Sequence, residues 1–213
     1  MPVQKRSTRA RKKAGQARSR ATVAALVEAT AHILERDGYD RASTNRIAEE
    51  AGVSIGSLYQ YFPGKDALVA AVIERHNQEL MHVVQNAMVE AAREPIGIGI
   101  RRLVVAAIEA HRVNPALHRV LAEQTPRSGE LEGVELFHRA AHELFHRYLE
   151  DHRSELRQSD LDLAAFICVT TIESLTHSAV IHRPEILAED AAERLVEETS
   201  HMIAAYLGIR SDA

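Results

Sequence analysis

Three histidines on one predicted helix have a spacing that can bind zinc. The run His142-Glu143-Leu144-Phe145-His146 puts two imidazoles one helical turn apart beside a glutamate, and His138 continues the same face. This His-Glu-x-x-His pattern can hold Zn²⁺ and activate water for hydrolysis. However, 11 of the 12 histidines follow residue 70, so a pair at this spacing also arises by chance. We therefore expect a polar stripe, no enzyme activity and no metal or other cofactor. A metal-responsive site, and after it a zinc hydrolase, are the alternatives.

A second group of residues, from Thr44 to Lys65, is organised as two short helices joined by a tight turn. The first helix is predicted to begin at Thr44, whose hydroxyl we expect to cap it. The second covers Ile55 to Phe62 and stops at Pro63-Gly64, and Gly52 permits the positive φ of the turn between them. The apolar side chains expected to bury each other are Ile47, Ala48, Ala51, Val53, Leu58 and Phe62.

The side chains expected to point outward from the second short helix are small or polar, which suits contact with DNA. Gly56 and Ser57 would let the helix enter a major groove about 12 Å wide. Gln60 can make paired hydrogen bonds to adenine, and Ser57 can bond either type of base. The groups suited to phosphate oxygens are those of Thr44, Tyr59, Tyr61 and Lys65. A plain helical hairpin in a bundle core is the alternative, and it would explain neither these residues nor the basic arm described below.

The spacing of these residues resembles the N-terminal signature of TetR-family transcriptional regulators. A helix ending in Gly38-Tyr39 precedes the pattern Thr-x-x-Ile-Ala-x-x-Ala-Gly-Val-Ser-x-Gly-x-Leu-Tyr-x-Tyr-Phe-x-x-Lys-x-x-Leu, which ends at Leu68. The resemblance covers about residues 18–70. It implies a homodimeric repressor that binds palindromic double-stranded operator DNA and is released by a small-molecule effector. The positions it implies for DNA contact are Thr44, Asn45, Arg46, Ser54, Ile55, Gly56, Ser57, Tyr59, Gln60, Tyr61 and Lys65.

The charge is divided unequally along the chain. Residues 1–65 carry 12 Lys and Arg against 6 Asp and Glu, a net +6, whereas the remaining residues carry 14 against 24, a net −10. Residues 1–20 alone hold eight basic residues and no acidic one. A polyanion is therefore attracted to the N-terminal third. We expect a basic arm over 1–17 that lies on DNA; a disordered tail and a targeting peptide are the alternatives.

The rest of the sequence predicts an all-α protein of about nine helices. The expected domains are the arm at 1–17, a three-helix helix-turn-helix domain at 18–64, and a helical effector-binding and dimerisation domain at 65–213. A long helix is expected from 65 to about 93, a second ends at about 113, and a third begins at Asn114-Pro115 and ends before a loop at 126–129. Three more are expected from 130 to 152, from 160 to 182 and from 184 to 207. The lone thiol, Cys168, favours a reducing cytoplasm.

The predicted helix from Asp160 to His182 is apolar on nearly all sides, which indicates burial by more than its own domain. Its apolar run from Leu163 to Ile172 is bounded by Asp162 and Glu173 and is far shorter than the roughly 20 residues that span a bilayer, so we do not expect a membrane helix. We expect a homodimer through the helices at about 160–182 and 184–207, with a central core helix in a monomer as the alternative. The candidate lining residues of an effector pocket are Val84, Met88, Leu117, Phe137 and Phe166, and plain core is the favoured alternative for each of them.

Overall fold

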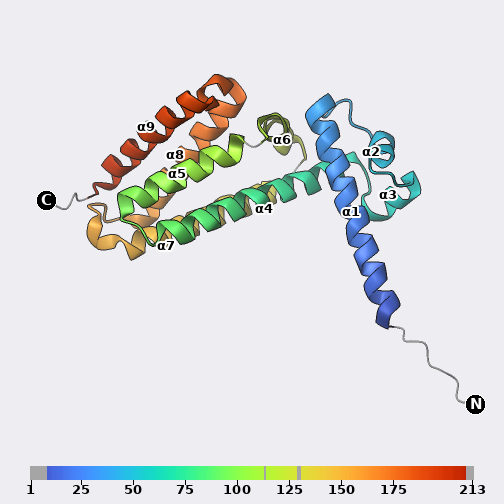
Figure 1. The fold of residues 1–213 in the computed structure, drawn as a ribbon, viewed down its shortest axis with the longest axis horizontal. Coiled ribbons are helices and arrows are strands. Elements are labelled where there is room, and N and C mark those ends of the chain that lie inside the picture. Colours follow the sequence, from blue (N-terminus) through green and yellow to red (C-terminus); the bar gives the residue numbers. More distant parts are fainter. Residues whose placement is uncertain (1–8, 113, 129–130, 210–213) are drawn as a thin grey trace, which may run out of the picture. The chain divides into compact units, whose positions relative to one another are not determined.

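The computed structural model describes residues 9–112, 114–128 and 131–209, with side chains described from residue 18 onward except at 124–134 and 189. These residues form nine α-helices and two short 3₁₀ helices, and no strand occurs among them. The all-α expectation is confirmed for the described chain (Figure 1). The chain divides into two compact units, residues 1–73 and 74–213. The first unit thus extends nine residues beyond the boundary expected at 64, and takes in the start of the fourth helix.

The first unit contains α1 (Arg9–Asp37), α2 (Thr44–Glu50), α3 (Ile55–Tyr61) and the beginning of α4 (Lys65–Ala91). Its core side chains, all completely buried, are Leu26, Ile33, Leu34, Ile47, Leu58, Leu68 and Val69. Gly38 ends α1 with a φ of 76°, in the left-handed region that favours glycine. The start predicted for α1 at about Arg18 is wrong, because the helix already runs from Arg9. Half of the expected arm is therefore helical.

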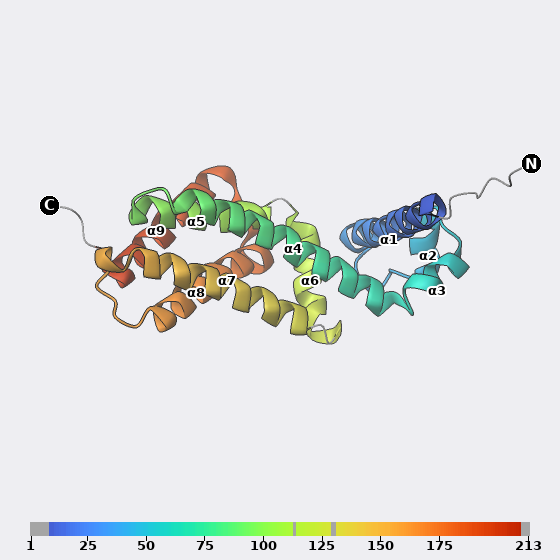
Figure 2. The same ribbon diagram turned by 90° about the horizontal axis from the view of Figure 1, so that it is seen from below.

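The second unit is a helical bundle built from the rest of α4 and five further α-helices. These are α5 (Ile96–Arg112), α6 (Pro115–Ser128), α7 (Leu131–Asp151), α8 (Leu161–His182) and α9 (Glu189–Leu207). The 3₁₀ helices η1 (Arg153–Glu155) and η2 (Pro184–Leu187) flank α8. α5 packs against α9 and α8, and α7 packs against α8 (Figure 2). This arrangement surrounds the buried face of α8 with apolar side chains.

Capping residues define several helix ends in this unit. The Asn114 side chain accepts a hydrogen bond from the Leu117 N–H at 3.0 Å, as expected for the start of α6. Asp160 caps α8 by accepting from the Leu163 N–H at 3.0 Å. The loop expected from Pro126 is wrong as far as residue 128, because α6 continues to Ser128. The last helix begins at Glu189 because Pro184–Leu187 forms the 3₁₀ turn η2 instead.

Helix α8 is long and apolar enough to cross a membrane if only its length and composition are considered. The structure gives it a different environment, since it packs against α5, α7 and η2. Leu161, Ala164, Cys168 and Val180 on this helix are almost completely buried in the core of the second unit. Burial also raises the pKa of the Cys168 thiol to about 12, which keeps it protonated and unreactive. A core helix of a globular domain accounts for these features.

Candidate nucleic-acid interface

The first helix of the hairpin is held by a cap one residue earlier than expected. The Ser43 side chain accepts a hydrogen bond from the Arg46 N–H at 3.4 Å, so Ser43 is the N-cap and Thr44 the first helical residue. The prediction that Thr44 caps α2 is therefore wrong, since its backbone is already helical. Its hydroxyl instead lies 3.2 Å from the Tyr59 hydroxyl, which joins the start of α2 to α3.

The turn between α2 and α3 has the geometry expected from its glycine. Gly52 has a φ of 66°, and the Val53 N–H donates to the Ala48 carbonyl at 3.0 Å. Leu58 is completely buried in the first unit and Ala48 almost so, as expected for the hairpin core. The other expected core residues, Ala51, Val53 and Phe62, are only half-buried. The hairpin is thus fixed mainly by its two most buried apolar residues, Leu58 and Ile47.

Helix α3 presents an exposed face of small and polar residues. Ser54 caps it by accepting from the Ser57 N–H at 3.1 Å, and the two serine hydroxyls lie 2.9 Å apart. The side chain of Tyr59 is 54% exposed, and Gln60 is exposed beside it. The remaining exposed residues of this face are Ile55, Gly56 and Tyr61. Gln60 is therefore accessible to solvent on the face predicted to read bases.

Gly56 is not required by the fold. A Cβ built at this position would meet only the Ser54 Oγ, at 4.0 Å, which is ordinary van der Waals contact. Its φ also lies outside the left-handed region, so an alanine would fit the same backbone. Since glycine weakens a helix relative to alanine, its presence here calls for a reason outside the folded chain. Close approach of another molecule to the helix backbone supplies such a reason.

Arg46 and Lys65, two cations expected at the interface, form contacts within the first unit. The Arg46 guanidinium binds the Asp37 carboxylate and donates to the Arg41 carbonyl at 2.7 Å. Hydrogen bonds from Arg36 and then from Arg46 lower the pKa of Asp37, which favours its ionised form. Arg46 thereby holds the end of α1 to α2, which makes it a positioning residue.

Lys65, the first residue of α4, is fixed by Tyr39. Its Nζ donates to the Tyr39 carbonyl at 3.1 Å and lies 3.8 Å from the centre of the Tyr39 ring. The Tyr39 hydroxyl in turn donates to Asp66. An ammonium has three donors, so Lys65 keeps hydrogen-bonding capacity for a phosphate. Sequence reasoning missed Ser43 and the positioning role of Tyr39, although both belong to the region that carries the family resemblance.

The residues suggested for an effector pocket do not share one environment. Leu117 is buried, and Val84, Met88 and Phe137 are half-buried in the second unit. Phe166 is 56% exposed on α8, so it does not line the interior of this chain. The first four of these residues stay predictions as pocket lining, whereas Phe166 has its ring on the surface.

The His-Glu-x-x-His stripe on α7 does not converge on one point. The imidazoles of its three histidines face three different carboxylates: His138 lies 3.6 Å from Glu173, His142 3.5 Å from Asp162, and His146 3.9 Å from Glu150. The rings of His142 and His146 are stacked with their centres 6.2 Å apart. Within the residues whose side chains are described, the group of histidines that does converge lies on α5, α6 and α8. No sequence motif connects those three.

Sequence and structure comparisons agree with this architecture. The profile described as "Bacterial regulatory proteins, tetR family" matches residues 26–72, and that described as "Tetracyclin repressor-like, C-terminal domain" matches residues 95–207. The nucleoid occlusion factor SlmA of Haemophilus ducreyi is 33% identical over 84 residues, which is 39% of this chain and 41% of that protein. The match thus spans about two fifths of the relative.

Two solved structures share the fold over most of the chain. SmeT, the repressor of the Stenotrophomonas maltophilia multidrug efflux pump SmeDEF, is 22% identical with a TM-score of 0.67, over 91% of this chain and 93% of SmeT. The fatty acid degradation regulator FadR of Bacillus halodurans is 17% identical with a TM-score of 0.68, over 89% of this chain and 97% of FadR. Together with the two profile matches, they identify the helix-turn-helix of α2 and α3 and the helical domain that follows. The chain belongs to the tetR family of bacterial regulatory proteins.

Proposed function

We propose that this regulator is a transcriptional repressor that binds palindromic operator DNA as a homodimer and leaves it when an effector binds the second unit. The observation that carries the proposal is the face of α3, where exposed polar side chains surround a glycine that the fold does not need. Gln60 would read a base, with Ser57 beside it. The structurally similar SmeT is itself the repressor of a multidrug efflux pump. A protein acting on the chromosome would work in the cytoplasm.

The homodimer is supported by apolar side chains on the outside of the second unit. Leu163 and Phe166 are 50% and 56% exposed on α8, and Met202 is 47% exposed on α9. Leu163 and Phe166 are three residues apart, so both lie on one face of α8. The same face continues through the small residues Thr170 and Ser174, which would permit close approach of a second helix. Two copies would give two reading helices, as palindromic sites require.

The proposal is tested by selecting binding sites from random duplex DNA with the purified full-length chain. We expect an enriched palindrome whose affinity falls steeply with salt, because Lys and Arg contacts to phosphate release counterions. Sedimentation measurements at the same protein concentration should give the mass of two chains. A monomer that retains no duplex at low salt would contradict the proposal. Enrichment of a site without two-fold symmetry would contradict the homodimeric mode alone.

A further inference from the structure

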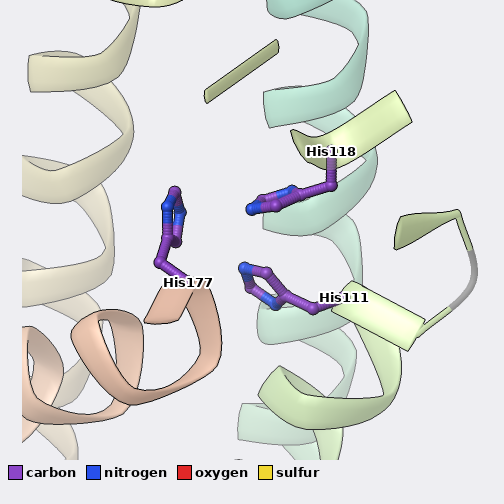
Figure 3. A group of neighbouring side chains, drawn as sticks. All are labelled: His111, His118 and His177. Carbon is purple, nitrogen blue, oxygen red and sulfur yellow. The ribbon is translucent and has the colours of Figure 1, made fainter. Parts of the chain in front are cut away.

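Three histidines from different helices converge in the second unit. His111 on α5, His118 on α6 and His177 on α8 point toward one another, with one ring nitrogen of each within 4.8 Å of the others (Figure 3). The ring centre of His118 lies 4.4 Å from that of His111 and 4.6 Å from that of His177. This convergence joins segments far apart in the sequence, and it involves none of the histidines on α7.

The environment keeps these imidazoles neutral. His111 and His118 are 8% and 4% exposed, and His177 is partly accessible. Burial lowers the pKa of all three, to about 2 for His118 and about 4 for His177. A neutral imidazole offers one nitrogen lone pair, which is the form that ligates metal ions. Of the three imidazoles, that of His177 is the most exposed to solvent.

Hydrogen bonds leave the inward nitrogens of two of the rings available. The Nδ1 of His111 lies 2.7 Å from the Ala107 carbonyl, which can only accept, so Nδ1 carries the proton and Nε2 carries the lone pair. The Nδ1 of His118 lies 2.8 Å from the Nε2 of His76 on α4. The Nε2 of His118 is buried and has no hydrogen-bond partner among the described residues. A buried polar atom without a partner is costly, and a bound ion would provide one.

We propose that His111, His118 and His177 form a binding site for one divalent transition-metal ion of the Zn²⁺ type. At a Zn–N distance of about 2.0–2.1 Å, tetrahedral ligand nitrogens lie about 3.3 Å apart, so the observed cluster needs only a small closing rotation of its side chains. Imidazole nitrogens suit zinc, copper and nickel, whereas magnesium and calcium prefer oxygen. Three protein ligands leave a fourth position for water, which favours an exchangeable ion over a permanent structural one.

His76 acts as a positioning residue for this site. When the Nδ1–H of His118 donates to the Nε2 of His76, the lone pair of His118 is directed into the cluster. His76 belongs to α4, the helix whose first residue is Lys65. The ion would thus engage α5, α6 and α8 directly and α4 through one hydrogen bond. We assign the ion as the effector of the regulator, and this regulatory part rests on the proposed function.

The site is tested with the full-length chain free of any polyhistidine tag and stripped of metal by chelation. Zn²⁺ is titrated against a chromophoric chelator, and bound zinc is counted by mass spectrometry after dialysis. We expect one zinc per chain, and a Co²⁺-loaded sample should show the visible spectrum of a tetrahedral site. His118→Ala and the isosteric His118→Gln should both abolish tight binding. His76→Ala should weaken it by about 10–100-fold, as loss of a supporting hydrogen bond does.

The matched controls are His142→Ala and His146→Ala, which remove histidines from the stripe on α7 and should leave zinc binding unchanged. Circular dichroism melting checks that each variant folds, and His118→Gln keeps the test valid if the alanine variant unfolds. If the wild type bound zinc no more tightly than His118→Gln does, the proposed site would be overturned. Loss of zinc binding in His142→Ala would overturn it as well.

The regulatory part is read separately, from the affinity of the selected operator with and without Zn²⁺. We expect zinc to change operator affinity of the wild type by at least about tenfold, corresponding to about 1.4 kcal/mol of coupling, and to leave that of His118→Gln unchanged. Zinc that binds without altering operator affinity would refute the regulatory role while the site stands. A chain that binds zinc and no duplex DNA would refute the proposed function instead.

Discussion

The substitution Gly56→Ala separates what α3 needs to fold from what it needs to bind DNA. Gly56 is the second residue of α3, and an added Cβ would have its nearest neighbour at 4.0 Å. Alanine is favoured over glycine in a helix by at most about 1 kcal/mol. The variant should therefore be as stable as the wild type or more so, with a Tm unchanged or raised by about 2–4 °C.

Binding to DNA should change in the opposite direction. The added methyl group projects from the face that carries Gln60, and it would hold the helix backbone away from the groove. Losing one well-formed base contact costs about 1–3 kcal/mol, which corresponds to roughly 5–150-fold in affinity. Fluorescence anisotropy with the selected operator measures this loss on the same preparation that is used for thermal melting.

The matched control is Gly97→Ala, because Gly97 is the second residue of α5 and a Cβ there would meet nothing within 4 Å. It should raise stability similarly while operator affinity stays constant. A Gly56→Ala variant that melts lower than the wild type would show that the fold needs the glycine, and would contradict the first expectation. Unchanged operator affinity would equally refute the role of Gly56 in close approach.

Three further substitutions test other parts of the molecule. Gln60→Ala should relax the base preference at about one position per half-site, at about 1–3 kcal/mol, and an unchanged sequence logo would contradict it. Gly99→Ala places a Cβ 2.1 Å from the Tyr148 hydroxyl and 3.0 Å from the Ala91 carbonyl, so the free energy of unfolding should fall by about 1–3 kcal/mol. Chemical denaturation measures that loss, and a value equal to that of Gly97→Ala would argue against the clash. Phe166→Glu should shift the sedimenting mass toward one chain without lowering the Tm of the monomeric form, because its ring is 56% exposed; a persistent dimer would remove Phe166 from the interface.

The sequence predicted the DNA-contacting hairpin well because local chemistry determines it. The positive φ of the turn is favoured by Gly52, the hairpin buries Leu58, and Pro63-Gly64 stops α3, all within one short segment. The errors there are small shifts between adjacent residues of similar chemistry, as with the capping hydroxyls of Ser43 and Thr44. The early start of α1 was missed because its basic residues carry no apolar stripe to indicate a helix.

The histidines of the second unit illustrate the limit of reasoning from spacing alone. His142 and His146 match a known metal motif, yet each lies beside a different carboxylate, so regular spacing put them on one face without giving them a common target. His111, His118 and His177 match no motif, because a site assembled from three helices has no fixed separation along the chain. Tertiary packing brings them together, burial lowers their pKa so that the rings stay neutral, and the buried Nε2 of His118 has no hydrogen-bond partner among the described residues. The proposed metal site therefore rests on convergence, neutrality and an unsatisfied ring nitrogen, none of which the spacing of histidines along the sequence reveals.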